Sequence, residues 1–256
     1  MALLQAKNVT HYFGGLCAVS NFNLDLDHGE LVGIIGPNGA GKTTIFNLIT
    51  GVYKATEGNI QLDGKELVGM RPSAITQLGI ARTFQNIRLF KDLTVLDNVR
   101  IAYYNWLEYS PWESLLHVGR YNDQEKLYTN KALDLLEFFK LDMFADELAK
   151  NLPYGSQRRL EIARALATGP KLLLLDEPAA GMNPREIEQL MDFIQWIRKE
   201  FNLTILLIEH QMRLVMGICE RLKVLDFGAT IAEGLPGEIR ANPKVLEAYL
   251  GEGGDS

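Results

Sequence analysis

Short apolar runs alternate with amphipathic segments along most of this chain. Residues 3–32 alternate as strands do and are interrupted at Gly14-Gly15. Residues 58–68 predict a hairpin with its turn at Asp63-Gly64, because an Asp-Gly pair between apolar runs favours a tight turn. From about residue 92 to 168 the apolar spacing is mainly that of helices. The first two thirds of the chain therefore combine a strand-rich part with a helical part.

Strands and helices then alternate through the rest of the chain. Residues 171–175 and 203–208 are buried-strand patterns, and residues 183–199 between them predict a helix. That helix has an asparagine N-cap, a proline at its first position and Glu186 three residues after the cap. Its expected buried stripe is Ile187, Leu190, Met191, Ile194 and Ile197. This alternation predicts an α/β fold with a mostly parallel sheet and helices on both faces.

A glycine-rich run lies between the strand pattern of residues 30–35 and a helix pattern that starts at Thr44. Its spacing is that of a phosphate-binding loop, and its residues are Gly36, Pro37, Asn38, Gly39, Ala40, Gly41, Lys42 and Thr43. Glycines let backbone N–H groups curl around phosphate oxygens, and the helix that follows directs its positive end at the same anion. Lys42 can reach the β- and γ-phosphates, and the Thr43 hydroxyl can ligate Mg²⁺. Together with Thr44, this run is the candidate site for the phosphates of a nucleotide.

Polar side chains follow the buried strands of the predicted sheet. Asp176 and Glu177 end the run Leu172–Leu175, and His210 follows the strand at 203–208. The carboxyl ends of parallel strands line the ligand crevice, so these side chains are expected beside the phosphates. Asp176 is placed to hold Mg²⁺ through water, Glu177 to act as general base and His210 to donate to a γ-phosphate oxygen. Gln85 is a candidate to contact Mg²⁺ or the attacking water.

The order of these motifs resembles that of the nucleotide-binding subunit of ABC transporters over essentially the whole chain. Leu152 to Ser156 stands where that family has its signature motif. The resemblance implies one nucleotide-binding domain over 1–256, an ABC-type P-loop fold with an antiparallel β subdomain and an inserted helical subdomain. The expected parts are a β subdomain with the P-loop core at 1–87 and 168–234, a helical subdomain at 88–167, a C-terminal helical segment at 235–251 and a disordered tail at 252–256.

The resemblance further implies that two such subunits pair head to tail, with each ATP between one phosphate loop and the other subunit's signature. Tyr154, Gly155 and Ser156 would then contact the partner's nucleotide, and Phe13, with Tyr12 in reserve, would stack on adenine. The chain departs from the family pattern at two places. In the signature, Pro153-Tyr154 replaces the usual Ser-Gly, and in the loop that the family has at the interface between its two ATPase subunits, Asn183 replaces an Asp. Because the phosphate loop and both carboxylates keep the family pattern, hydrolysis is still expected.

Within the family, the chain is similar to the longer ATPase subunit of branched-chain amino-acid importers. The similarity lies in residues 79–90 and 154–164 and, above all, in 231–234 and 238–251. It implies a different, shorter ATPase as dimer partner, two membrane-spanning permease subunits and a solute-binding protein. The longer ATPase carries an extra stretch after the Gln85 region, here roughly residues 103–126. Its aromatic residues either dock on the permease or pack the helical subdomain: Tyr103, Tyr104, Trp106, Tyr109 and Trp112.

Net charge, cysteine content and the length of the apolar runs indicate which partners and which location to expect. The chain has 256 residues and a net charge of −6, so no broad basic surface and no nucleic-acid partner are expected. Cys17 and Cys219 are the only cysteines, which favours a reducing compartment. The N-terminus lacks a signal-peptide pattern and no apolar run approaches ~20 residues, so we do not expect the chain to cross a membrane by itself. The resemblance implies a peripheral protein at the cytoplasmic face of the inner membrane. Other readings are a urea or amide importer, a lipopolysaccharide exporter or a soluble ABC ATPase. Asp226-Phe227-Gly228 matches a kinase motif but is expected to be a turn.

Overall fold

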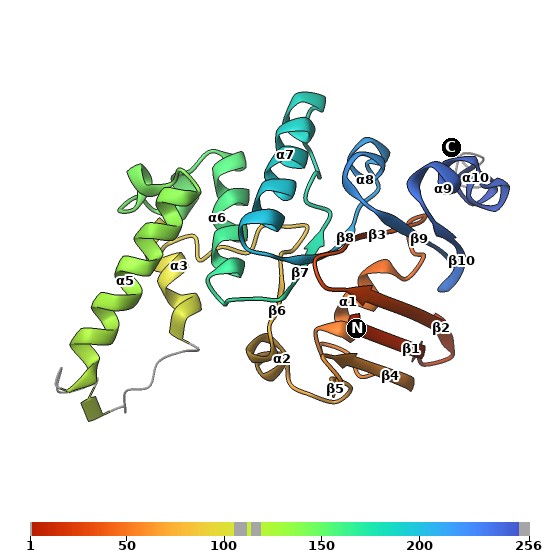
Figure 1. Ribbon diagram of the computed structural model, residues 1–256, viewed down its shortest axis with the longest axis horizontal. Helices are drawn as coiled ribbons and strands as arrows, with labels where there is room; N and C mark the ends of the chain where they lie inside the picture. The colour runs from red at the N-terminus through yellow and green to blue at the C-terminus, as the bar shows by residue number, and fades with distance from the viewer. Residues whose placement is uncertain (1, 105–111, 114–118, 251–256) are drawn as a thin grey trace. The chain divides into compact units, whose positions relative to one another are not determined.

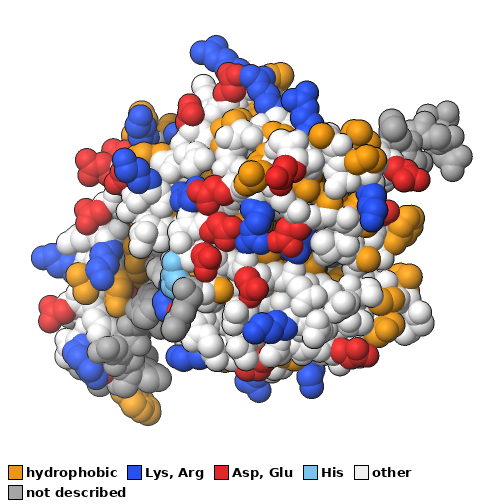
Figure 2. Space-filling view, turned by 45° about the vertical axis from the view of Figure 1, so that its right-hand side comes forward, with side chains coloured by type: hydrophobic (Ala, Val, Ile, Leu, Met, Phe, Trp, Pro, Cys, Tyr) orange, Lys and Arg blue, Asp and Glu red, His pale blue; other side chains and the backbone are white. Residues whose placement is uncertain are grey.

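The computed structural model describes residues 2–104, 112–113 and 119–250 (Figure 1). The chain forms two compact units, one of Met1–Gln85 with Lys171–Ser256 and the other of Asn86–Pro170. Within the described ranges, none of the helices has both the length and the apolar content that crossing a membrane requires. Acidic and basic side chains are mixed over the face that Figure 2 presents, in keeping with the modest net charge of −6.

A four-stranded antiparallel sheet belongs to the first unit. Its order is β2-β1-β4-β5, with β1 at Ala2–Phe13, β2 at Leu16–Asp27, β4 at Glu57–Leu62 and β5 at Lys65–Glu66. β1 and β2 separate at Gly14-Gly15, as the sequence predicts. The turn of the β4–β5 hairpin lies at Asp63-Gly64, and both residues have positive φ, as such a tight turn requires.

A six-stranded sheet carries the phosphate loop. Its order is β10-β9-β3-β8-β7-β6, with β3 at Leu31–Ile35, β6 at Ile80–Arg82, β7 at Leu172–Asp176, β8 at Thr204–Ile208, β9 at Arg221–Asp226 and β10 at Ala229–Gly234. All neighbours are parallel except β10, which pairs antiparallel with β9 across the turn at residues 226–228. The mostly parallel sheet and this turn are therefore confirmed. Asp176 pairs with Ile208, so β7 and β8 end side by side.

Alternate residues of the central strands face two different layers. One face packs on the antiparallel sheet and on α1 (Lys42–Ile49), and its side chains are Val32, Ile34, Leu172, Leu174, Leu206 and Ile208. The other face is covered by α7 (Pro184–Glu200) and α8 (Met212–Ile218), which lie above the strands in Figure 1. At Gly33 a Cβ would lie 2.7 Å from Leu222 and 3.0 Å from Cys219 Sγ. Glycine there allows the α8 region to approach the sheet.

Helix α7 begins as its sequence predicts. Asn183 Oδ1 accepts from the N–H groups of Arg185 and Glu186, and the Glu186 carboxylate accepts from the Asn183 N–H at 2.8 Å. Four positions of the expected stripe are buried: Ile187, Leu190, Ile194 and Ile197. Met191 is only half-buried, so its assignment as buried was wrong. It lies over Gly217 of α8, where any Cβ would come within 2.2 Å of its methyl group.

Each unit has further helices of its own. In the first unit these are α2 (Pro72–Leu78), α9 (Pro236–Ala241) and α10 (Pro243–Leu250). In the second unit they are α3 (Val95–Tyr103), α5 (Arg120–Phe138), the 3₁₀ turns η2 (Asp142–Phe144) and η3 (Ala149–Asn151), and α6 (Tyr154–Leu166). The described part of 92–168 is thus mainly helical, as predicted.

The aromatic group of the second unit is described only in part. Tyr103 stacks on Tyr128 with ring centroids 5.4 Å apart, while Tyr104 and Trp112 are exposed by 50% and 72%. Trp106 and Tyr109 lie outside the described residues. One aromatic side chain therefore packs inside the unit and two face solvent.

Candidate nucleotide-binding and hydrolysis site

The loop after β3 is an open cradle of backbone groups. Gly36, Gly39 and Gly41 all have positive φ, of 147°, 78° and 96°. A Cβ at Gly36 would lie 2.1 Å from the Leu225 carbonyl oxygen, and one at Gly41 would lie 2.5 Å from the Ala18 carbonyl oxygen. Both approaches exclude any side chain. The conformation that a phosphate loop needs is therefore present, and it depends on contacts with β9 and β2.

Lys42 points back into this loop. Its Nζ donates to the carbonyl oxygens of Gly36 at 2.6 Å and Pro37 at 2.7 Å, and the residue is only 7% exposed. Thr43 is exposed and Thr44 half-buried in the first turn of α1. A buried ammonium, a glycine cradle and a helix N-terminus directed at one point suit a bound phosphate chain. The residues present therefore fit the phosphates of a nucleotide.

A pocket of about 430 Å³ opens beside the loop, within the range of about 300–1,000 Å³ usual for small-molecule sites. It is lined by Phe13, Leu16, Cys17, Ala18, Asn38, Gly39, Ala40, Gly41, Lys42, Thr43, Thr44, Glu177, Phe227 and Gly228. Phe13 is 44% exposed and packs edge-on against His11 and Tyr53, with centroids 4.7 and 5.2 Å away. Tyr12 is not among the lining residues. Phe13 therefore stays the predicted adenine-stacking side chain.

Three predicted catalytic side chains meet at the carboxyl edge of the parallel sheet. Gln85 Nε2 donates to Glu177 Oε2 at 2.6 Å. His210 Nδ1 lies 3.6 Å from the same oxygen, which is too long for a hydrogen bond. Glu177 has a φ of 45°, a conformation that costs a non-glycine residue about 1–3 kcal/mol, and its N–H donates to Ile208 O at 2.9 Å. The contact with β8 holds this strained residue in place.

Asp176 has a partner that sequence reasoning missed. Its Oδ2 accepts from Arg82 Nη2 at 2.7 Å, and both side chains are 7% exposed. Arg82 Nη1 also donates to Asn47 Oδ1 of α1 at 2.7 Å. The guanidinium lies over the rings of Phe84 and Phe46, 4.9 and 5.4 Å from their centroids. Arg82 therefore joins the end of β7 to the helix that carries Thr43.

Thr43, Asp176 and Gln85 supply a hydroxyl, a carboxylate and an amide, and oxygen atoms are the ligands that Mg²⁺ prefers. Because Arg82 links Asp176 to α1, the carboxylate is held close to the helix of the phosphate loop. The oxygen donors of this set fit Mg²⁺.

The signal for Arg82 in the sequence was its place just before the Gln85 segment, but which acid it pairs with depends on the β6–β7 pairing.

Glu209 was also missed as a site residue, although it directly precedes His210. It is fully buried, and its carboxylate accepts three backbone hydrogen bonds. Ala179 N–H donates to Oε1 at 2.9 Å, and the N–H groups of His210 and Gln211 donate to Oε2 at 2.7 and 3.0 Å. This side chain links the loop after β7 with the loop after β8.

The predicted signature residues begin α6 in the second unit. Tyr154 is 50% exposed, and no atom lies within 4 Å of a Cβ built on Gly155. Ser156 is buried, its hydroxyl accepts from Arg159, and its N–H donates to Pro153 O at 2.9 Å. The Ser156 N–H is therefore already bonded in the first turn of its own helix. Gly155 lies at an open surface.

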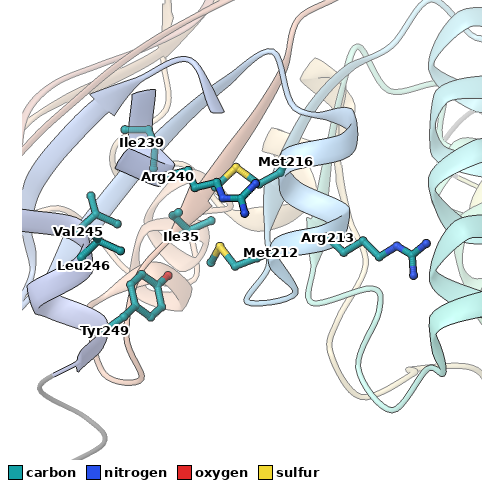
Figure 3. A pocket seen from close by; sticks show the side chains of 9 residues that line it. All are labelled: Ile35, Met212, Arg213, Met216, Ile239, Arg240, Val245, Leu246 and Tyr249. Carbon is teal, nitrogen blue, oxygen red and sulfur yellow. The ribbon is translucent and has the colours of Figure 1, made fainter. Parts of the chain in front are cut away.

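A second pocket, of about 530 Å³, lies between α8 and the two C-terminal helices (Figure 3). It shares no lining residue with the nucleotide pocket and is mainly apolar: Ile35, Met212, Met216, Ile239, Val245 and Leu246, with Arg213, Arg240 and Tyr249. Figure 3 shows Arg213 directed away from the apolar side chains, and it pairs with Glu188 on α7.

Comparisons with known proteins agree with this geometry. Residues 19–180 match the family model of ABC transporters, and residues 229–255 match that of the branched-chain amino acid ATP-binding cassette transporter. The chain is 46% identical over 250 residues to two high-affinity branched-chain amino acid transport ATP-binding proteins, BraF of Pseudomonas aeruginosa and LivG of Escherichia coli, covering 98% of each chain. A solved ATP-binding cassette of an ABC transporter in its ADP conformation is 34% identical, with a TM-score of 0.85 over 98% of this chain and 99% of that one. The chain belongs to the ATP-binding subunits of the ABC transporter family.

Proposed function

We propose that this chain is the ATP-hydrolysing subunit of a membrane importer for branched-chain amino acids. The observation that carries the proposal is the meeting of Gln85 and Glu177, with His210 close by, at the sheet edge beside the phosphate-loop pocket. The family membership supports ATP as the nucleotide. The cargo class rests on the names of the relatives and on the C-terminal match, because an ATPase subunit does not itself contact the transported solute.

The residues divide the work of hydrolysis among them. The loop N–H groups and Lys42 hold the phosphates, which requires Lys42 to exchange at least part of its bonding to the loop carbonyls. Thr43 and Asp176 would hold Mg²⁺, and the ion would supply neutralisation of the phosphate charge. Glu177 accepts the proton of the attacking water, and His210 donates to a γ-phosphate oxygen.

Gln85 couples this chemistry to the segment that leads into the second unit. Its bond to Glu177 occupies an oxygen that the attacking water needs. We therefore expect the Gln85–Glu177 bond to open when ATP is bound, which would leave the Gln85 amide available to the attacking water or to a Mg²⁺ ion held there. Such a change would report nucleotide occupancy to the helical unit.

The proposed assembly has four kinds of subunit. This chain pairs head to tail with a different, shorter ATPase, so that Tyr154, Gly155 and Ser156 complete the partner's nucleotide site. Two permease subunits span the membrane and a solute-binding protein delivers the cargo. The chain itself lies peripherally at the cytoplasmic face of the inner membrane. The open surface at Gly155 supports a close approach of phosphate there.

The proposal is tested by uptake of labelled leucine in the source cells. Wild type is compared with a deletion strain complemented by the wild-type gene, by Glu177→Gln or by Glu188→Gln. Glu188 is a matched control because its carboxylate is 55% exposed on α7. Uptake restored by the wild type and by Glu188→Gln, but not by Glu177→Gln, is the expected result. Unchanged uptake in the deletion strain would assign another cargo, with urea tested next, while steady-state hydrolysis by purified Glu177→Gln would refute the general base.

A further inference from the structure

Glu209 is a buried acid at the centre of the hydrolysis edge. Its side chain is 0% exposed, and it stands directly before His210 at the end of β8. Among the described residues, the His210 ring is the one basic group recorded within 4 Å of the carboxylate, with Nδ1 3.6 Å from Oε2. The charge is therefore held mainly by backbone N–H groups.

The two oxygens of Glu209 bind two different loops. Oε1 accepts from Ala179, two residues after Glu177, and Oε2 accepts from His210 and from Gln211. An ionised carboxylate only accepts hydrogen bonds, so both of its oxygens are available to backbone N–H groups. A second hydrogen bond joins the same two loops, from Glu177 N–H to Ile208 O at 2.9 Å. The stretch 177–179 is thus fastened at both ends to the stretch 208–211.

We propose that Glu209 is a positioning residue for hydrolysis, which fixes the loop of the general base Glu177 to the loop of His210 so that both side chains keep one geometry. The proposal rests on the function proposed above. Glu209 is not among the residues that line the nucleotide pocket, and it acts through the backbone of its neighbours.

The chemistry of this position favours positioning over simple packing. A buried charge is costly, and an apolar residue fills space more favourably than an ion held among peptide groups. A carboxylate can accept from both loops with two equivalent oxygens, whereas a glutamine of the same size has one acceptor oxygen and an N–H₂ group. In Glu209→Gln that N–H₂ would face a backbone N–H, and one of the two loops would lose its acceptor.

The test compares Glu209→Gln with wild type and with the surface control Glu188→Gln, in the full-length chain within the assembled transporter. Two quantities are measured: the stoichiometry and affinity of a fluorescent ATP analogue, and kcat with KM for ATP. The phosphate loop is not touched by the change, so we expect full stoichiometry and KM within about twofold, with kcat lowered by about tenfold or more. Glu188→Gln should leave both quantities unchanged.

Two outcomes would overturn the positioning role. One is an unchanged kcat in Glu209→Gln, and the other is a kcat that falls only in proportion to the binding stoichiometry, which would mean a loss of folded protein. The double variant with His210→Ala provides a second readout. Because Glu209 acts in part through His210, the two losses should combine to less than their product, and a strictly multiplicative loss would refute the coupling. A wild-type chain without hydrolysis would refute the proposed function instead.

Discussion

Replacing Arg82 with methionine removes the buried partner of Asp176 while keeping an unbranched, though shorter, side chain. The salt bridge between Nη2 and Oδ2 is 2.7 Å long and both side chains are 7% exposed. The same change deletes the hydrogen bond to Asn47 and the stacking over Phe46 and Phe84. Asp176 would remain as a desolvated charge without its cation.

The magnitude follows from that residual charge. Removing one partner of a buried ion pair costs about 3–5 kcal/mol, mostly because the other charge stays unpaired, whereas an exposed pair contributes about 0–1 kcal/mol. We expect Arg82→Met to lower the free energy of unfolding by about 3–5 kcal/mol, measured by urea titration without nucleotide. Arg213→Met is the matched control because the Arg213–Glu188 pair is 55% exposed on both sides, and its loss should stay below about 1 kcal/mol.

A second variant isolates the cause. In Arg82→Met combined with Asp176→Asn the buried charge is gone, so a large part of the lost stability should return. If Arg82→Met lowered the free energy of unfolding by less than about 1 kcal/mol, the reasoning would be refuted, because the Arg82–Asp176 pair would then contribute no more than an exposed ion pair does. A double variant that is no more stable than the single one would refute it equally, because the unpaired carboxylate would then not be the source of the cost.

Three further predictions concern other parts of the first unit. In Gly36→Ala the new Cβ would lie 2.1 Å from the Leu225 carbonyl oxygen, so the variant should lose binding of a fluorescent ATP analogue. Gly39 faces open space, so Gly39→Ala should lower the free energy of unfolding by only about 1 kcal/mol, measured by thermal unfolding. Cys17 lines the nucleotide pocket, so a maleimide should label it more slowly when ATP is present. The same reagent should label Cys219 only in urea, because burial raises the pKa of that thiol to about 12. Rapid labelling of Cys219 in the native protein would contradict this. Burial raises the pKa of Glu233, but its ion pairs with Lys223 and Arg221 outweigh burial and lower the pKa below its ordinary 4.5. The stability that this carboxylate contributes above pH 4.5 is therefore lost as pH falls through its lower pKa in the folded protein. Glu233→Gln should show a smaller drop in the unfolding midpoint between pH 7 and acidic pH than the wild type, and an unchanged drop would count against this reasoning.

Features that depend on neighbours in the chain were predictable. The phosphate loop is determined within eight residues, by glycine spacing and by the strand and helix on either side. The N-cap of α7 and the turn at Asp63-Gly64 follow from local hydrogen bonds and from the φ values that those residues tolerate. Sequence also indicated that Asp176, Glu177 and His210 lie at or just after the ends of parallel strands, because the apolar runs before them are of strand length.

Only the tertiary structure decided which of these groups touch. Gln85 and Glu177 are 92 residues apart, Arg82 and Asp176 are 94 apart, and Ala179 and Glu209 are 30 apart. A periodic pattern states which face a residue occupies but not which strand lies next to it, so the partner of a buried charge is invisible along the chain. Strand order and register supply that information, because they bring the ends of β6, β7 and β8 together. The chain thus determined the kind of chemistry locally, while long-range pairing determined which side chains hold it in place.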